Sequence, residues 1–317
     1  MSERCIVAVI VTFNRLALLK DTISSLLTQD LQLSRIIVVN NNSSDGTTQY
    51  LENLSFSTTT VKHMQLSTNI GGAGGFSVGI EEAMKCSPNF VWLMDDDTIP
   101  ASDALSKLVN GVDHAEGVLN RQVGFACSKA IWTDGAVHRM NVPSIASFVN
   151  GVPFNFSNHA FAITSCTFVS VLIRASVIQQ VGLPYREYFI WVDDVEYTTR
   201  ITNRGYMGIY VTDSEVHHKT GSNYTATIAD GTPASAWKYF YEVRNKLHFW
   251  RVNYTFSKRV IFIPLYSLKF LIETLRRKDN RMRFFWIVLR GIAAGIFFRP
   301  RVRKVSGLVC SITGDTE

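Results

Sequence analysis

Three short, strongly apolar runs and one partly alternating run, each separated from the next by a helix-like segment, dominate the first hundred residues. Leucine and isoleucine recur at three- and four-residue spacing between Leu16 and Leu27, which predicts an amphipathic helix after the first run. Strands that alternate with helices of this length predict a doubly wound, mostly parallel α/β sheet. The four runs are CIVAVIV (5–11), IIVV (36–39), residues 61–66 and FVWLM (90–94).

Polar residues follow each of these four runs. In an open α/β sheet, ligands bind beyond the carboxyl ends of the strands. Four consecutive strand ends with polar residues therefore predict one polar rim and a ligand site along it. The polar segments are residues 12–15 (TFNR), 40–42 (NNN), 69–75 (NIGGAGG) and 95–97 (DDD).

The three aspartates after the fourth run are the most specific feature of this rim. Adjacent carboxylates repel one another, so a compensating cation is expected where they follow a buried strand. Asp95 and Asp97 alternate with Asp96 and would face the same way, and their oxygens suit a hard divalent metal beside a diphosphate. The simpler alternative is a solvated acidic turn that caps a helix over 102–115. The position directly behind a buried strand favours the metal.

The glycine-rich stretch after Asn69 permits close approach of a ligand to the backbone and presents amides at a helix start. It is not the dinucleotide-binding fingerprint, because Ser77 stands where the third glycine would be required. A flexible turn is the structural alternative.

A second acidic group follows an aromatic run in FIWVDDVEY (189–197). Apolar walls raise the pKa of a carboxylate toward a value useful for a general base. Capping of a helix by Asp193 or Asp194 is compatible with that role. Trp191 either stacks on a sugar face or belongs to the core.

Further on, a histidine pair, His217 and His218, ends the segment that follows a strand predicted over 207–211. One neutral imidazole at this position can bind a metal.

The charge of the chain is strongly divided. Residues 238–304 hold 17 Lys and Arg against three acidic residues, a net +14, whereas the rest of the chain carries −8. Two apolar runs there, 260–272 and 284–298, fall short of the roughly 20 residues that span a bilayer. They predict interfacial helices on an anionic membrane surface. The alternatives are packing on the rest of the protein or contacts in a homo-oligomer. No nucleic-acid motif accompanies the basic residues, so no nucleic-acid partner is expected.

Taken in order, the motifs resemble the inverting family 2 glycosyltransferases, which have a GT-A nucleotide-sugar-binding fold. The pattern is most similar to bacterial galactofuranosyltransferases, with rhamnosyltransferases next. The resemblance implies a GT-A catalytic domain over 1–236, divided into a nucleotide-sugar part (about 1–100) and an acceptor part (about 101–236), and a basic helical membrane-association region over 237–317. The motifs are VTFNR (11–15), VVNNNSSDGT (38–47), NIGGAGGFSVGI (69–80), WLMDDDT (92–98), WVDDVEY (191–197) and HHKTGS (217–222).

The resemblance also implies a role for individual residues. Asp194 corresponds to the general base, and Trp191, Asp193 and Glu196 to acceptor-binding residues. Asp95, Asp97 and His218 correspond to ligands of Mn²⁺ or Mg²⁺. Arg244 and Asn245 match a recurrent pattern whose role the sequence does not reveal. The implied nucleotide-sugar contacts are Thr12, Asn14, Arg15, Asn40, Asn69, Gly74, Asp95 and Asp96.

The function implied is metal-dependent, inverting sugar transfer in bacterial cell-surface polysaccharide synthesis. The expected donor is UDP-galactofuranose, with dTDP-rhamnose as the alternative, and the expected acceptor is a polyprenyl-diphosphate-linked glycan. The enzyme would be peripheral, on the cytoplasmic face of the plasma membrane. Two other classes stay open: a non-enzymatic protein that uses the basic tail to bind membrane or nucleic acid, and an inactive scaffold of the same fold.

Overall fold

The computed structural model describes residues 4–223 and 227–305, so the end of the region predicted over 237–317 lies outside the described residues. The first half contains β1 (Ile6–Thr12), α1 (Leu16–Leu27), β2 (Arg35–Asn40), α2 (Thr47–Ser57), β3 (Val61–Gln65), α3 (Gly71–Met84), β4 (Phe90–Asp95), β5 (Thr98–Pro100), α4 (Ala104–Leu119), β6 (Val123–Ile131) and η1 (Arg139–Asn141). The second half contains β7 (Phe148–Val149), β8 (Val152–Pro153), β9 (Ala160–Ile163), β10 (Val171–Arg174), α5 (Ala175–Val181), η2 (Arg186–Tyr188), α6 (Asp193–Asn203), β11 (Met207–His218), η3 (Pro233–Ser235), α7 (Lys238–Asn253), α8 (Phe256–Leu275) and α9 (Arg281–Phe297).

One mixed sheet runs through residues 6–218, within the region predicted as the catalytic domain and here called the catalytic part. Its strand order is β3-β2-β1-β4-β10-β6-β11-β5, with β9 paired to β11. The first four strands in this order are parallel to one another, as the alternation of strands and helices predicts. Beyond them, β10 lies antiparallel between β4 and β6, and β11 is parallel to β6. The sheet therefore joins a doubly wound nucleotide-type half to a mixed second half.

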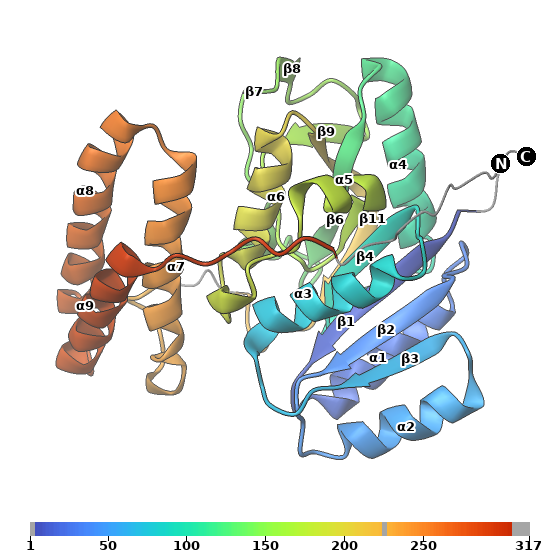
Figure 1. The fold of residues 1–317 in the computed structure, drawn as a ribbon, viewed down its shortest axis with the longest axis horizontal. Helices are drawn as coiled ribbons and strands as arrows, with labels where there is room; N and C mark the ends of the chain where they lie inside the picture. Colours follow the sequence, from blue (N-terminus) through green and yellow to red (C-terminus); the bar gives the residue numbers. More distant parts are fainter. Residues whose placement is uncertain (1–3, 224–226, 306–317) are drawn as a thin grey trace, which may run out of the picture.

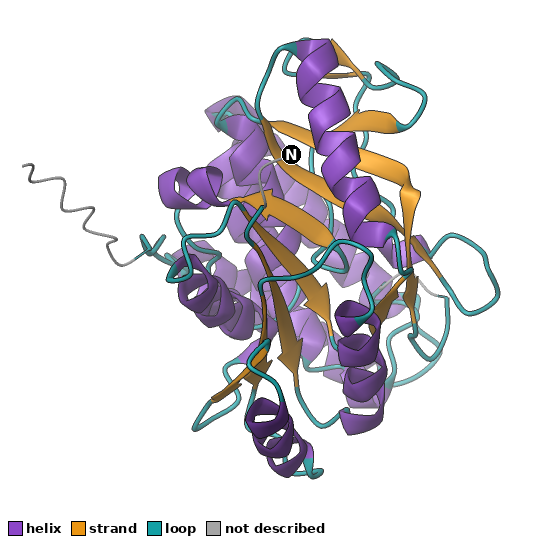
Figure 2. Ribbon diagram, turned by 90° about the vertical axis from the view of Figure 1, so that its right-hand side faces the viewer, coloured by secondary structure: helices purple, strands orange, loops and turns teal. Residues whose placement is uncertain are grey.

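Helices cover both faces of this sheet (Figure 2). Successive residues of β1 alternate between two apolar cores: Ile6, Ala8 and Ile10 pack with the α1 and α4 side chains, whereas Val7 and Val9 pack with those of α3 and α5. A strand buried on both faces reads as a continuous apolar run. This explains why the run at 5–11 shows no polar alternation.

The glycine-rich stretch forms the first turns of α3, so it lies at a helix start and is not a flexible turn. Gly71 alone among its glycines has a positive φ, of 77°. Further along, a Cβ at Gly75 would lie 2.5 Å from a Val11 methyl group, and one at Gly79 would lie 2.4 Å from Val9. Gly75 and Gly79 therefore let α3 lie directly on β1.

The last three helices, α7, α8 and α9, form a separate layer beside the sheet, here called the helix trio (Figure 1). Their side chains share a core that includes Val243, Leu247, Phe270 and Phe284. The chain then returns to the catalytic part, where the backbone NH of Leu183 donates to the Arg303 carbonyl (2.8 Å). No helix among the described residues is long and apolar enough to cross a membrane. The helical C-terminal region is confirmed, and its membrane role stays a prediction.

Candidate active site

The carboxyl ends of β1 and β4 place their polar side chains against each other. The Thr12 hydroxyl, at the end of β1, donates to Asp96 Oδ2 (2.7 Å). The Arg15 guanidinium donates to Asp97 Oδ2 (2.6 Å) and Asp96 Oδ1 (3.3 Å). Burial raises the pKa of Asp96 to about 6, against the opposing charge of Arg15. The rim therefore holds buried acidic groups that one arginine only partly neutralises.

Asp95, Asp97 and His218 form a group that can hold a metal, with one potential ligand atom of each lying within 4.8 Å of the others. Pairing of β11 with β5 places His218 opposite Thr98, directly beside the aspartates. Strand alternation turns His218 inward, where it is buried, and leaves His217 exposed. The structure thus brings together the three residues that the sequence predicts as metal ligands.

The chemistry of this group fits a divalent cation such as Mn²⁺, since two carboxylates and one imidazole supply oxygen and nitrogen ligands. His218 Nδ1 lies 2.8 Å from Asn141 Oδ1 and Nε2 lies 3.1 Å from Asp97 Oδ1, so partners on both sides orient the ring with Nε2 toward the aspartates. Burial and the neighbouring Asp97 raise the pKa of Asp95 to about 7. Burial acts the same way on Asp97, but the His218 hydrogen bond and charge, with Arg15, hold its pKa below the usual value.

Asp193 and Asp194 begin α6, where the helix amides favour negative charge. Burial raises the pKa of Asp194 to about 6, although the Val195 backbone NH donates to its carboxylate (2.7 Å). Burial, followed by the charge of Asp194, raises the pKa of Asp193 well above its usual value, and Asp95 adds to this shift. Asp194 therefore has the pKa expected of a general base near neutral pH.

A cavity of about 270 Å³, here called the acid cavity, brings these two groups face to face. Asp95, Asp96, Asp97 and His218 line one part of it, and Asp193, Asp194 and Trp191 line another. The two acidic segments, almost a hundred residues apart in sequence, thus share one space. The cavity combines a possible metal site with a carboxylate able to accept a proton.

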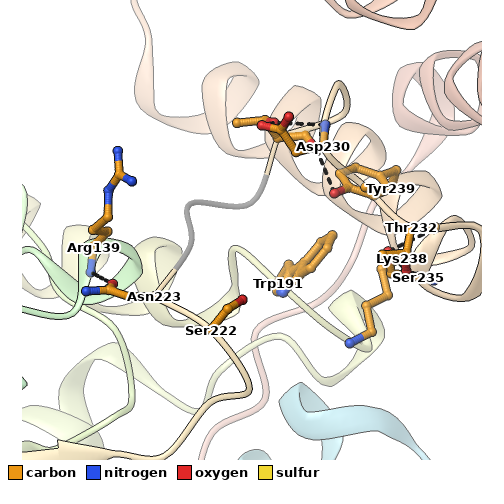
Figure 3. A pocket seen from close by; sticks show the side chains of 11 residues that line it. Arg139, Trp191, Ser222, Asn223, Asp230, Thr232, Ser235, Lys238 and Tyr239 are labelled. Carbon is orange, nitrogen blue, oxygen red and sulfur yellow. Dashed lines mark hydrogen bonds between the residues drawn. The ribbon is translucent and has the colours of Figure 1, made fainter. Parts of the chain in front are cut away.

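Two further cavities adjoin the acid cavity. The rim cavity, of about 300 Å³, is lined by Thr12, Arg15, Asn69 and Asp96 among others. The outer cavity, of about 510 Å³, has Trp191 at its centre, Lys238 and Tyr239 from α7 on one side, and Asn223 opposite (Figure 3). Lys238 lines all three cavities, and Trp191 lines both the acid and the outer cavity.

Four of the predicted contact residues lie outside these cavities. Asn14 and Asn40 hold the neighbouring turn through hydrogen bonds from the backbone NH groups of Ser44 (2.7 Å) and Ser43 (2.9 Å). Gly74 lies in the first turn of α3 and faces the side chain of Ile70, the residue before the helix. The carboxylate of Glu196 is buried and accepts from Arg200 Nε (3.0 Å), as an ion pair along α6. These residues support the site without facing its space.

Within two segments predicted to line the rim, other residues than those singled out face the cavity, and one lining residue was not predicted at all. Asn41 rather than Asn40 lines the rim cavity, and Gly71 and Gly72 rather than Gly74 do so from the glycine-rich stretch. Asn41 also donates to the Gly71 carbonyl (2.9 Å), which ties β2 to α3. The sequence did not single out Lys238, because it is one of many basic residues in its region. Only the position of α7 in the fold places it at the cavities.

Comparison with known proteins agrees with this geometry. Galactofuranosyltransferase GlfT1 from Mycolicibacterium smegmatis is 25% identical over 266 residues, which cover 75% of this chain and 80% of that protein. The Campylobacter jejuni GalNAc(5)-diNAcBac-PP-undecaprenol beta-1,3-glucosyltransferase is 37% identical over 103 residues, or 32% of each chain.

Solved structures show the same fold. GalNAc-T7 with UDP, GalNAc and Mn²⁺ superposes with a TM-score of 0.62 at 13% identity, covering 92% of this chain and 55% of that one. The mannosyltransferase PcManGT from Pyrobaculum calidifontis, with GDP-Man and Mn²⁺, gives 0.54 at 15% identity, covering 94% and 76%. Residues 7–173, more than half of the chain, match the sequence model of Glycosyl transferase family 2. The chain therefore belongs to glycosyl transferase family 2 and has the GT-A fold.

Proposed function

We propose that this protein transfers galactofuranose from UDP-galactofuranose, with inversion, to a lipid-linked glycan in cell-surface polysaccharide synthesis. The observation that carries the proposal is the acid cavity, in which a metal-competent group faces a carboxylate with a pKa of about 6. The choice of sugar is supported by the similarity to GlfT1 over three quarters of the chain. The lipid-linked acceptor is supported by the Campylobacter relative, whose name specifies an undecaprenol diphosphate substrate.

The rim cavity is the proposed nucleotide site. Thr12, Arg15 and Asn69 line it, and Asp95 and Asp96 lie where it meets the acid cavity. Asp95, Asp97 and His218 would hold Mn²⁺ or Mg²⁺, which when bound stabilises the negative charge that develops on the leaving diphosphate. The fit of two carboxylates and an oriented imidazole supports this assignment.

Lys238 provides a second positive charge for the diphosphate. Its ammonium lies over the rings of Trp191 (5.7 Å) and Trp237 (5.9 Å), and the described residues offer it no carboxylate partner. Burial and the nearby Arg15 charge lower the pKa of Lys238. An anion bound between Lys238 and Arg15 would relieve the repulsion between these two side chains, which supports a phosphate position there.

The outer cavity is the proposed acceptor site. An aromatic floor with hydroxyl and amide groups around it suits a sugar, and Trp191 meets Tyr239 edge to face at 5.3 Å. An acceptor hydroxyl that reaches the acid cavity would lose its proton to Asp194 as its oxygen bonds to the anomeric carbon. The bond from that carbon to the diphosphate oxygen breaks on the opposite side, so one displacement inverts the configuration.

The helix trio is the proposed membrane contact, which would place the enzyme at the cytoplasmic face of the plasma membrane. Large apolar side chains are exposed on α8 and α9, including Ile261 (63%) and Trp286 (56%). They share α8 and α9 with exposed basic residues such as Lys258 and Arg290, which belong to the stretch 238–304 of net charge +14. Apolar groups that enter the interface beside lipid phosphates would bind the surface without spanning it.

A nucleotide-sugar panel tests the proposed reaction. The purified protein is incubated with Mn²⁺ or Mg²⁺, a polyprenyl-diphosphate-linked glycan and each sugar nucleotide, and nucleoside diphosphate release and product mass are measured. UDP-galactofuranose should give acceptor-dependent release of UDP and a product heavier by one hexose. Turnover with dTDP-rhamnose alone would replace the proposed donor.

A further inference from the structure

The segment that leads into Asp193 and Asp194 has an unusual backbone. Phe189, Trp191 and Val192 have φ angles of 66°, 64° and 71°, in the left-handed region that bulky and β-branched residues rarely adopt. Such conformations persist only where surrounding contacts impose them, and they cluster at functional sites. The local sequence therefore does not account for this segment, residues 189–192, here called the strained segment.

One buried side chain of the helix trio makes most of these contacts. The Asn245 amide, on α7, donates to the backbone carbonyls of Tyr188 (2.9 Å), Ile190 (3.1 Å) and Trp191 (2.9 Å). Asn245 is fully buried. One NH₂ group thus contacts three of the four carbonyls from Tyr188 to Trp191, and the Tyr188 carbonyl also accepts from the Ile190 backbone NH (2.7 Å).

Arg244 completes the arrangement. Its guanidinium donates to the Glu187 (2.6 Å) and Tyr188 (3.1 Å) carbonyls. It also donates to Asn245 Oδ1 from Nε (3.0 Å) and Nη2 (2.9 Å). These bonds fix which end of the amide faces the strained segment, because a flipped Asn245 would point its oxygen at three carbonyl oxygens.

The first turn of α3 holds the segment from the other side. The Ala73 backbone NH donates to the Phe189 carbonyl (3.2 Å), and a Cβ at Gly71 would lie only 2.0 Å from that carbonyl oxygen. Gly71 itself lines the rim cavity. The strained segment is thus held between the proposed donor site and the helix trio.

We infer that Arg244 and Asn245 are positioning residues that impose the strained segment and thereby set Trp191, Asp193 and Asp194 in the acid cavity. This inference rests on the proposed function for the claim that Asp194 is the base. Neither residue lines any of the three cavities, so both act through the backbone of residues 187–191. A displacement of about 1 Å in a catalytic group can lower turnover about 100-fold.

The test compares Asn245→Asp and Asn245→Leu with Asn253→Asp. Both Asn245 variants keep the approximate size of the side chain and remove the NH₂ donors. Asn253 is a matched control, because it lies on the same helix and its amide donates to the Phe249 carbonyl (2.9 Å), away from the strained segment. The measurements are kcat with the donor that the panel identifies, UDP affinity, and amide hydrogen exchange in peptides covering 187–195.

We expect both Asn245 variants to lower kcat about 100-fold, to leave UDP affinity within threefold, and to speed exchange in 187–195 at least tenfold. Asn253→Asp should change each quantity less than twofold. Unchanged exchange in 187–195, or faster exchange with kcat within threefold of the native enzyme, would overturn the inference. The exchange measurement needs no substrate, so it still tests the inference if the proposed donor is wrong.

Arg244→Lys decides the matter if neither Asn245 variant folds. This variant keeps the positive charge and loses the planar fork that contacts both carbonyls and Asn245. It should lower kcat about tenfold and speed exchange in 187–195 while UDP affinity is retained. Native kcat and native exchange in Arg244→Lys would contradict the inference.

Discussion

The catalytic part and the helix trio contribute to the same cavities in different ways. The sheet rim provides Asp95 and Asp97 from residues adjacent in sequence, at the end of one buried strand. The helix trio provides Lys238 to the cavities directly and Asn245 indirectly, through contacts with a segment more than fifty residues away. The comparison teaches that reactive groups can be read from local motifs, whereas the groups that position them depend on the assembled fold.

The largest effect should come from the catalytic part. Asp194→Asn should lower kcat about 1,000-fold, because the amide keeps the shape of the carboxylate and cannot accept the acceptor's proton. UDP affinity should stay within threefold of the native value. Turnover and UDP binding are measured on the same preparation, with the exposed Asp213→Asn as control. Native turnover in Asp194→Asn would remove this residue from the mechanism.

On the inner side of the helix trio, Lys238→Met should weaken donor binding. A charge-assisted hydrogen bond is worth about 1.5–3 kcal/mol, which corresponds to a 10- to 100-fold loss in kcat/KM for the donor. Lys246→Met is the matched control on the same helix, where the ammonium pairs with Glu242 (2.5 Å) instead. If Lys238→Met and Lys246→Met have the same kcat/KM for the donor, Lys238 does not bind the diphosphate. The helix trio would then act only by positioning other residues.

The pH dependence should show the pKa of Asp194. This carboxyl has a pKa raised to about 6, so it is deprotonated and active as a base above that pH and protonated below it. At constant saturating metal, kcat should fall about tenfold between pH 7 and pH 5, and the protein should stay folded by circular dichroism. The residual rate of Asp194→Asn should lack this acidic limb. A flat native profile between pH 7 and pH 5 would contradict the assignment.

The smallest effect concerns the outer side of the trio. Ile261→Ser with Trp286→Ser should reduce sedimentation with vesicles containing anionic lipid about fivefold, because both side chains are exposed on α8 and α9. Activity on a soluble acceptor should not change. Phe56→Ser is the control, since Phe56 is 94% exposed on α2 in the catalytic part. Vesicle binding equal to that of the native chain would end the membrane interpretation of these helices.

The parts of the candidate site that the structure brings together as the sequence predicts depend on short-range rules. Strand alternation turns His218 inward and His217 outward, and the end of β4 fixes where the aspartates lie. Successive side chains along a strand point to opposite sides, so an error of one residue in predicting where β2 ends changes which of the asparagines at 40–42 faces the cavity. This is why Asn41 lines the rim cavity, whereas Asn40 bonds to Thr48 and Gln65.

Three further differences between the sequence prediction and the structure have identifiable physical causes. Glu196 and Arg200 are four residues apart on one helix, a spacing that favours an ion pair. The Glu196 carboxylate therefore pairs with Arg200 and does not face the predicted acceptor site. The glycine-rich stretch begins α3, and the contact of Gly75 with Val11 could not be predicted locally because Val11 lies on β1. The role of Asn245 was invisible, because it requires the left-handed backbone of the strained segment and the position of α7.

The most direct test of the account measures how metal affects UDP binding. UDP affinity is determined by titration calorimetry with Mn²⁺, with Mg²⁺ and with chelator, for the native chain and for Asp97→Ala, His218→Ala and His217→Ala. His217 is adjacent to His218 and exposed, so it controls for the loss of an imidazole at this strand end. We predict that Mn²⁺ strengthens UDP binding at least tenfold in the native chain and in His217→Ala, and that this gain disappears in Asp97→Ala and His218→Ala. An equal gain from metal in all four folded proteins would contradict the proposed metal site and, with it, the central claim.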